Sequence, residues 1–286
     1  MTGLRSGLLG LLLMTALAGC TRAPVADQPV ADQPVTTTTR PSAPPSTAVT
    51  TSVPATSPAR SSAVPASTHP TSAAPSPSAK PIAPVSAQAQ AAGLIDIRTI
   101  VPDAIIDLRY ATSHNFVGVV LYPPNARCLI HQSMAPGLTT AANALRRQGF
   151  QLVFWDCYRP HPVQVHMFQI VPDSNWVARP GPYATSHEAG RSVDVTLAHA
   201  APGWRCAPAD QVQHRCLLDM GTGFDDFTAR AHAFASYGVS AQAQSNRALL
   251  RAAMNLGGIV VYSGEWWHFD GPGSLVERPI LDAPVY

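Results

Sequence analysis

The chain has 286 residues, of which 46% are hydrophobic and 13% charged, and its net charge is +2. That charge comes from the front end, because residues 93–286 hold fourteen Arg against fifteen Asp and Glu. No basic stripe appears there, so the sequence offers no electrostatic source for nucleic-acid binding. The sequence also indicates no protein partner. No apolar run of spanning length follows the N-terminus, which excludes a multi-pass membrane protein.

The first twenty residues predict export. Arg5 gives a positive start, and residues 8–18 form an apolar run with the length of a signal-peptide core. The run ends in Leu17-Ala18-Gly19-Cys20, which resembles the lipobox of bacterial lipoproteins. The resemblance implies cleavage before Cys20, lipidation of its thiol and a membrane anchor facing the periplasm or cell wall. The alternative is an ordinary secretory signal with an incidental cysteine, which also exports the chain.

Residues 21–92 are predicted to form a disordered tether. The stretch contains fourteen of the 28 prolines and no Phe, Trp or Tyr. It therefore cannot bury enough apolar surface to offset the entropy of ordering. Such a chain is extended and either holds a domain away from the membrane or acts as a plain spacer. The foldable part is then one domain over residues 93–286, which is long enough for a real core.

That domain mixes predicted helices and strands without a regular alternation. Apolar and alternating runs predict strands over 103–110, 151–155, 193–197 and 259–262, and one-sided apolar spacing predicts helices over 136–148, 162–170 and 245–256. Pro136 suits the first turn of its helix, and Gly149 suits the stop. The pattern favours an α+β fold: a single compact domain with a mixed or antiparallel sheet and flanking helices.

Four cysteines remain after Cys20, and an even count in an exported chain suggests two disulfides. Four cysteines allow three pairings. We favour Cys206–Cys216, which closes a short loop, with Cys128–Cys157 as the second bond. A thiolate metal site is disfavoured because no C-x-x-C spacing occurs, and a catalytic cysteine is disfavoured further.

Two polar clusters are candidates for chemistry. In the first, His187 precedes a predicted strand that carries Asp194, and Gly190 between them lets the backbone double back. In the second, Glu265 and His268 follow the strand predicted over 259–262. Two histidines and an aspartate are good zinc ligands, and three protein ligands leave a fourth position for water, as in catalytic zinc sites.

A carboxylate beside such a site is needed to move the proton of the activated water. Glu265 reaches the same point as His268 only if the backbone there is irregular, because a flat strand sends residues three apart to opposite faces. From spacing alone, a zinc site and ordinary packing of these side chains are equally open.

The chain resembles the VanX-type D-alanyl-D-alanine dipeptidases, which are zinc peptidases related to D,D-carboxypeptidases and to the hedgehog domain. The resemblance covers most of residues 94–286 and includes the S-x-H-x-x-G-x-A-x-D and E-x-W-H signatures. It is carried by the ordered blocks DLRYAT at 107–112, WDCYRP at 155–160, TSHEAGRSVD at 185–194, MGTGFD at 220–225, SNR at 245–247 and GEWWH at 264–268.

This resemblance implies hydrolysis of the dipeptide D-Ala-D-Ala to D-alanine at the cell envelope. It implies one Zn²⁺ per chain, held by His187, Asp194 and His268, with Glu265 as general base and acid. Arg159 would stabilise the oxyanion with its fixed guanidinium fork. The small dipeptide pocket would be lined by Tyr110, Thr185, Ser186 and Asp225, with Asp225 near the substrate ammonium.

Other interpretations of these residues stay open. Arg159 suits a surface ion pair, Asp225 suits a helix N-cap before Phe227, and Tyr110 suits an ordinary core position. The alternative functions are a D,D-carboxypeptidase acting on peptidoglycan stem peptides and a non-catalytic wall-binding lipoprotein.

The sequence departs from the family pattern at two signature positions. Thr185 replaces the usual Ser, and Ser192 replaces the usual Ala. Export is a third departure, because the glycopeptide-resistance members act in the cytoplasm. Salvage of wall-derived dipeptide therefore suits this chain better than resistance.

Overall fold

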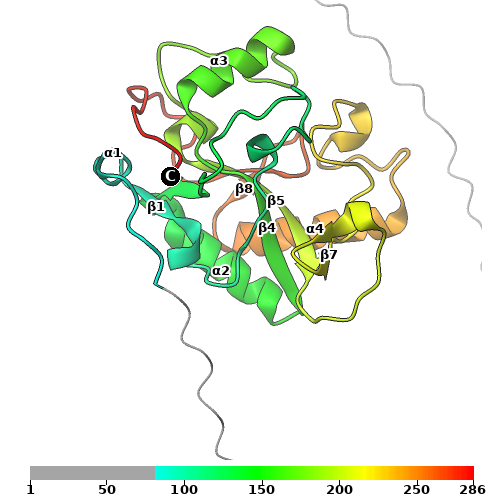
Figure 1. Cartoon of the computed structure of the whole chain (residues 1–286). Coiled ribbons are helices and arrows are strands. Elements are labelled where there is room, and N and C mark those ends of the chain that lie inside the picture. The colour runs from blue at the N-terminus through cyan, green and yellow to red at the C-terminus, as the bar shows by residue number, and fades with distance from the viewer. Residues whose placement is uncertain (1–80) are drawn as a thin grey trace, which may run out of the picture. The chain divides into compact units, whose positions relative to one another are not determined.

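Five strands form the central sheet of the structure, a computed structural model that describes residues 81–286 (Figure 1). Their order across the sheet is β2 (Ile105–Ile106), β4 (Phe150–Asp156), β5 (Ser192–His199), β9 (His268–Asp270) and β8 (Val260–Val261). The β2–β4 pair is parallel and the other pairs are antiparallel, so the sheet is mixed. Two short antiparallel pairs lie outside it, β1 (Leu94–Asp96) with β3 (Leu129–His131) and β6 (Gln211–Val212) with β7 (Arg215–Cys216).

Four α-helices accompany these strands within residues 81–286. They are α1 (Ala87–Ala91), α2 (Ala135–Arg146), α3 (His161–Ile170) and α4 (Ala241–Leu256). Helices and strands do not alternate regularly, which confirms the α+β class. No helix in this part of the chain is both long and apolar enough to cross a bilayer.

Several boundaries differ from the sequence prediction. The strand predicted over 103–110 shrinks to β2, because a 3₁₀ turn at Arg109–Ala111 follows it closely. Helix α4 begins four residues earlier than predicted, where the Ser240 side chain accepts a hydrogen bond from the Ala243 amide and caps the helix.

The ordered domain also starts before residue 93. Helix α1 lies in the segment assigned to the tether, and its Ala89 is fully buried. Small apolar residues in a five-residue helix leave little periodic signal, so the sequence did not reveal this helix. Cys20 and the tether up to residue 80 lie outside the described residues.

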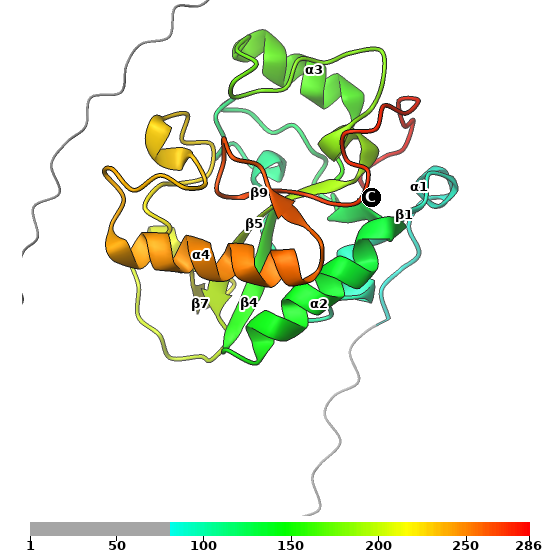
Figure 2. The ribbon, with the colours of Figure 1, turned by 180° about the vertical axis from the view of Figure 1, so that it is seen from behind.

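Helices α2 and α4 pack side by side on one face of the sheet (Figure 2). Their backbones approach closely where Gly137 of α2 meets Gly257, the residue that follows α4. A Cβ built on Gly137 would lie 2.4 Å from the Gly257 carbonyl oxygen, closer than real contacts allow. The two glycines therefore set the distance between α2, which packs against β4, and α4, which packs against β8.

Replacement of Gly137 by Ala is expected to destabilise the domain, because the added methyl group forces the two helices apart. Overpacking of this kind lowers the free energy of unfolding by about 1–3 kcal/mol, measurable by urea denaturation. Gly181→Ala is the matched control, since the nearest atom to its new Cβ is 4.0 Å away. Equal stability of the two variants would contradict the expected clash.

Candidate metal centre and active site

Three neighbouring strands place one polar residue each in a single row across the sheet. The antiparallel register pairs Asp194 of β5 with Asp156 of β4 on one side and with His268 of β9 on the other. The β4–β5 register shifts between Phe154 and Asp156, so Trp155 bulges out of the ladder. Side chains directly opposite each other on one face lie close together. The sheet therefore brings Asp194 beside His268 without any loop contribution.

His187 reaches this row from the 3₁₀ turn Ser186–Ala189, just before β5. The turn ends at Gly190, which has a φ of +63°. A Cβ there would lie 2.6 Å from the Leu94 side chain. Both the left-handed backbone and the lack of space require glycine, and the resulting reversal brings His187 back over Asp194.

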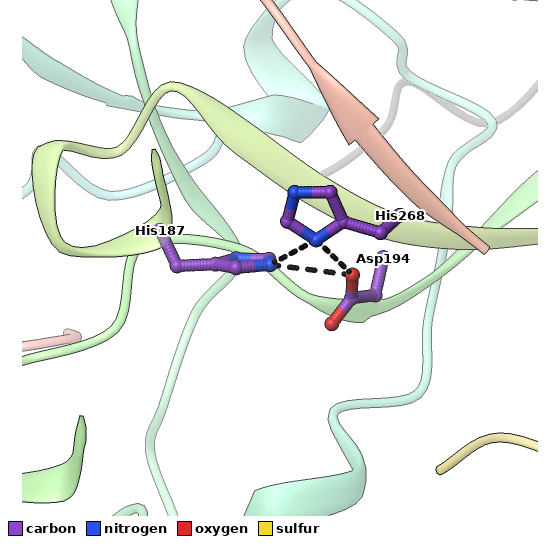
Figure 3. Close-up of side chains that lie close together, drawn as sticks. All are labelled: His187, Asp194 and His268. Carbon is purple, nitrogen blue, oxygen red and sulfur yellow. Dashed lines mark hydrogen bonds and ion pairs between the residues drawn. The ribbon is translucent and has the colours of Figure 1, made fainter. Parts of the chain in front are cut away.

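The three side chains meet in one buried cluster (Figure 3). His187 Nε2 lies 3.0 Å from His268 Nδ1 and 3.2 Å from Asp194 Oδ1, and His268 Nδ1 lies 3.1 Å from Asp194 Oδ1. Tetrahedral zinc with bonds of about 2.0–2.1 Å separates its ligand atoms by about 3.3 Å. The three atoms are thus spaced almost as a zinc ion requires.

Proton positions favour a cation at this point as well. His187 Nδ1 is 2.8 Å from the Cys157 carbonyl oxygen, which can only accept, so Nδ1 carries the proton and Nε2 of the neutral ring does not. An unprotonated Nε2 and an Asp194 carboxylate oxygen face each other across the cluster. Lone pairs that converge in this way are stabilised by a shared proton or by a metal ion, and the nitrogen and oxygen donors suit zinc.

Glu265 stands beside the cluster. It lies in the turn between β8 and β9, and its Oε2 is 4.0 Å from His268 Nδ1. The backbone at Glu265 is therefore irregular, as the sequence interpretation required. Burial raises the pKa of Glu265 to about 7, although the positive charge of His268 opposes this rise. A carboxyl group with a pKa near neutrality is suited to both accepting and donating a proton.

Arg159 is buried beside the cluster, so the alternative of a surface ion pair is wrong. Its Nε and Nη2 donate to Asp156 Oδ2 at 2.9 and 2.7 Å, and its Nη1 donates to Gln164 Oε1 at 2.7 Å. Nη2 also lies 3.8 Å from Asp194 Oδ2. These contacts fix the guanidinium group at the edge of the cluster.

Asp156 is a buried residue beside the cluster for which the sequence predicted no role. It is fully buried and accepts hydrogen bonds from Arg159 and, at 2.6 Å, from the Tyr122 hydroxyl. Its only sequence signal was its place in the WDCYRP block. The structure gives it the task of holding Arg159.

Tyr110 and Asp225 meet on the far wall of the same cavity. The Tyr110 hydroxyl donates to Asp225 Oδ2 at 3.0 Å. No helix begins at Phe227 in the described chain, so the N-cap interpretation of Asp225 is wrong. Tyr110 is a core residue, and it also lines the cavity. Burial and the nearby carboxylates Asp194 and Glu265 raise the pKa of Asp225 well above its usual range.

The loop that carries Asp225 is tied to α4 by Arg247. This buried guanidinium donates to the carbonyl oxygens of Met220, Arg230 and His232 at 2.7 to 3.0 Å. The contacts span both sides of Asp225 in the sequence. They explain why a loop without regular structure holds Asp225 in a defined place, in a backbone conformation with a φ of +55°.

These residues surround one cavity of about 270 Å³. Sites for drug-sized ligands are typically about 300–1,000 Å³, so this cavity suits a small ligand. All nine residues implied as metal, catalytic or substrate-binding groups line it, including Thr185 and Ser186. The Ser186 hydroxyl is already engaged, since it donates to Ser192 Oγ at 2.9 Å and lies 3.4 Å from His268 Nε2.

The structure contains two disulfides, Cys128–Cys157 and Cys206–Cys216. The first joins the start of β3 to the end of β4, and it includes the residue whose carbonyl oxygen orients His187. The second closes the β6–β7 region, and neither of its cysteines lines the cavity. Only the first disulfide is therefore built into the support of the site.

Replacement of both Cys128 and Cys157 by Ala is expected to lower the free energy of unfolding by about 2–5 kcal/mol and also to weaken zinc binding. The second effect follows because the Cys157 carbonyl group would no longer be held under His187. Replacement of Cys206 and Cys216 by Ala is the matched control. It removes a disulfide of shorter loop and should leave the zinc affinity unchanged, as measured by chelator competition. Equal zinc affinities in the two double variants would contradict this support role.

The α+β fold and this set of ligand-type and acid–base residues are suited to a hydrolase. Comparison with known proteins specifies which one: the Peptidase_M15 family model, described as D-ala-D-ala dipeptidase, matches residues 90–286. The chain belongs to this family.

Named relatives agree with the family match. A D-alanyl-D-alanine dipeptidase of Escherichia coli (strain K12) is 37% identical over 188 residues, covering 66% of this chain and 89% of the relative. A protein of the same name from Enterococcus faecium is 31% identical over 192 residues, covering 63% of this chain and 91% of the relative. The solved structure of the LdcB LD-carboxypeptidase is weakly similar, with a TM-score of 0.34, 16% identity and coverage of 64% of this chain and 69% of that one.

Proposed function

We propose that this peptidase hydrolyses D-Ala-D-Ala to D-alanine with one zinc ion bound by His187, Asp194 and His268. The observation that carries the proposal is the convergence of three ligand atoms, all within 4.8 Å of one another, beside the buried carboxyl group of Glu265. Bound there, zinc would lower the pKa of a water molecule towards about 7 and polarise the peptide carbonyl group.

Glu265 serves as the general base and acid. Its carboxylate takes the proton of the attacking water, and the same group then passes the proton to the amine that leaves. The buried position and the pKa of about 7 suit both halves of this transfer near neutral pH. Glu265 Oε2 lies 4.0 Å from His268 Nδ1, so the proton transfer takes place next to the ligand cluster.

Arg159 stabilises the negative charge that develops on the peptide oxygen. Its guanidinium group is buried and held by Asp156 and Gln164, so it is oriented before substrate arrives. A fixed cation in a water-poor site stabilises developing charge without reorganisation during the reaction.

Asp225 binds the ammonium group of the dipeptide. Burial disfavours its ionised form, and a substrate ammonium group beside it would favour that form again. The Tyr110 hydroxyl lies 3.0 Å from Asp225 Oδ2 and 3.3 Å from Oδ1, so it fixes the carboxyl group in the wall of the cavity where the substrate would bind. A peptide extended at its N-terminus has no ammonium group at this position and would leave Asp225 buried and unpaired.

The zinc-loaded full chain should therefore release D-alanine from D-Ala-D-Ala much faster than from a stem pentapeptide ending in D-Ala-D-Ala. The measurement is D-alanine release from both substrates at equal concentration. Faster release from the pentapeptide would replace the proposal by a D,D-carboxypeptidase activity. Zinc binding without release from either substrate would replace it by a non-catalytic wall-binding role.

We also propose that the chain works outside the cytoplasm, as a lipoprotein anchored through Cys20. Support comes from the lipobox-like sequence and from the two disulfides, because such bonds persist in oxidising compartments. Expression of the Cys20→Ala variant should move the enzyme from the membrane fraction to the soluble exported fraction. Unchanged membrane association would reject the anchor.

A further inference from the structure

The side of His268 that faces away from Asp194 has partners of its own. In Figure 3 one ring nitrogen points at His187 and Asp194, and the other points away from them. The outward nitrogen, Nε2, lies 3.3 Å from Asp270 Oδ1 and 3.4 Å from Ser186 Oγ. Asp270 is the last residue of β9, two positions beyond His268, so both side chains project to the same face.

Ser192 completes a hydrogen-bonded ring around this nitrogen. The Ser186 hydroxyl donates to Ser192 Oγ at 2.9 Å, and the Ser192 hydroxyl donates to Asp270 Oδ1 at 2.5 Å. Each hydroxyl has one proton to give, so Ser186 Oγ is left to accept from His268 Nε2. His268 Nε2 therefore contacts the Asp270 carboxylate in two ways, directly and through the Ser186 and Ser192 hydroxyls.

The strand register makes this ring possible. Ser192 of β5 is paired directly with Asp270 of β9, and Ser192 is fully buried. An alanine at position 192, the residue usual in the family signature, has no hydroxyl and would leave Asp270 without this donor. The departure from the signature therefore has a defined contact in this chain.

We propose that Asp270 and Ser192 are positioning residues that fix the ring orientation and tautomer of His268. A proton held on Nε2 leaves the lone pair of Nδ1 directed at the point where His187 and Asp194 converge. Carboxylates that hold a metal-ligating histidine in this way raise its basicity and fix its ring. The inference rests on the proposed metal centre, because it concerns how one ligand of that centre is oriented.

The test measures metal affinity and ligand geometry apart from turnover. In the full-length chain, Asp270→Ala should weaken zinc binding about 10- to 100-fold in chelator competition. It should also change the visible absorption of the cobalt-loaded protein. Asp270→Asn keeps an oxygen that accepts from Nε2 and should restore most of the affinity. Ser192→Ala should give a smaller loss, in the same direction.

Asp103→Ala is the matched control, because it removes an acidic residue that pairs with Arg146 away from the cavity. A loss of zinc affinity in the control equal to that of Asp270→Ala would overturn the inference. The inference would also be overturned if Asp270→Ala bound zinc with native affinity and gave an unchanged cobalt spectrum. Failure of the wild-type chain to bind zinc or cobalt would instead reject the metal centre itself, so the two failures are distinct.

Discussion

Replacement of Glu265 by Gln is expected to lower the turnover of D-Ala-D-Ala about 10²- to 10⁴-fold, the usual contribution of a positioned acid–base group. Gln has nearly the same shape but neither takes the proton of the water nor returns it to the leaving amine. Zinc content should be unchanged, because Glu265 is not one of the three ligands. The measurement is kcat for D-alanine release together with metal analysis of the same sample.

Glu277→Gln is the control for the loss of one carboxylate, since Glu277 is exposed and does not line the cavity. Its turnover should equal that of the unaltered chain. If Glu265→Gln keeps more than a tenth of the native kcat, another group moves the proton and the assigned role of Glu265 is wrong.

The same substitution has a pH-dependent effect on the stability of the metal-free protein. Burial raises the folded-state pKa of Glu265 from 4.5 to about 7, so the unfolded chain ionises first as pH rises. Ionisation of Glu265 therefore lowers the free energy of unfolding progressively between about pH 4.5 and pH 7. Above that range the free energy of unfolding stays lowered by the same amount. In the presence of a chelator, Glu265→Gln should gain stability over the native chain at pH 8 but not at pH 4. Equal differences at both pH values would contradict the raised pKa.

Replacement of Asp194 by Ala is expected to abolish both zinc binding and activity. Asp194 supplies the only negative charge among the three ligands and lies within 3.2 Å of both histidine nitrogens. Its loss should lower zinc affinity by more than the roughly 10- to 100-fold caused by changes around a ligand. Titration calorimetry with zinc and the rate of D-alanine release are the two measurements.

Asp103→Ala again provides the comparison, because it breaks an ion pair on the surface and should affect neither measurement. Native-like zinc affinity in Asp194→Ala would exclude Asp194 as a ligand. The proposed centre would then lose its only anionic member, and the function derived from it would fall as well.

The sequence predicted much of the fold and the main residues of the site. Apolar residues located α2, α3, β4 and β5 to within a few residues. Helix α2 buries one apolar face, and most residues of β4 and β5 are buried on both faces of the sheet. The family signatures identified His187, Asp194, Glu265 and His268, which the structure brings together. Catalytic and ligand residues at fixed spacing can be recognised in a sequence even when the fold of the chain between them cannot be predicted.

Residues that act by supporting others were not predicted. Asp156 and Asp270 have no distinctive spacing, and their roles depend on which strands are neighbours and in which register. Strand β9 was missed because it has three residues and begins at His268, so it shows no alternation. The role of the Ser192 hydroxyl depends on its hydrogen bond to Asp270, which lies directly opposite on β9 and is far away in the sequence.

Asp156, Asp194 and His268 lie opposite one another on three neighbouring strands, so the centre depends on the number of residues in each of these strands. Successive side chains of a strand point to opposite faces, so inserting or deleting one residue within β5 would turn Asp194 away from its two neighbours. The bulge at Trp155 corrects the count by one residue on β4, which places Asp156 rather than the indole ring opposite Asp194. Variation in length within the family is thus expected in surface loops, whereas these three strands must keep their residue count for the enzyme to assemble its centre.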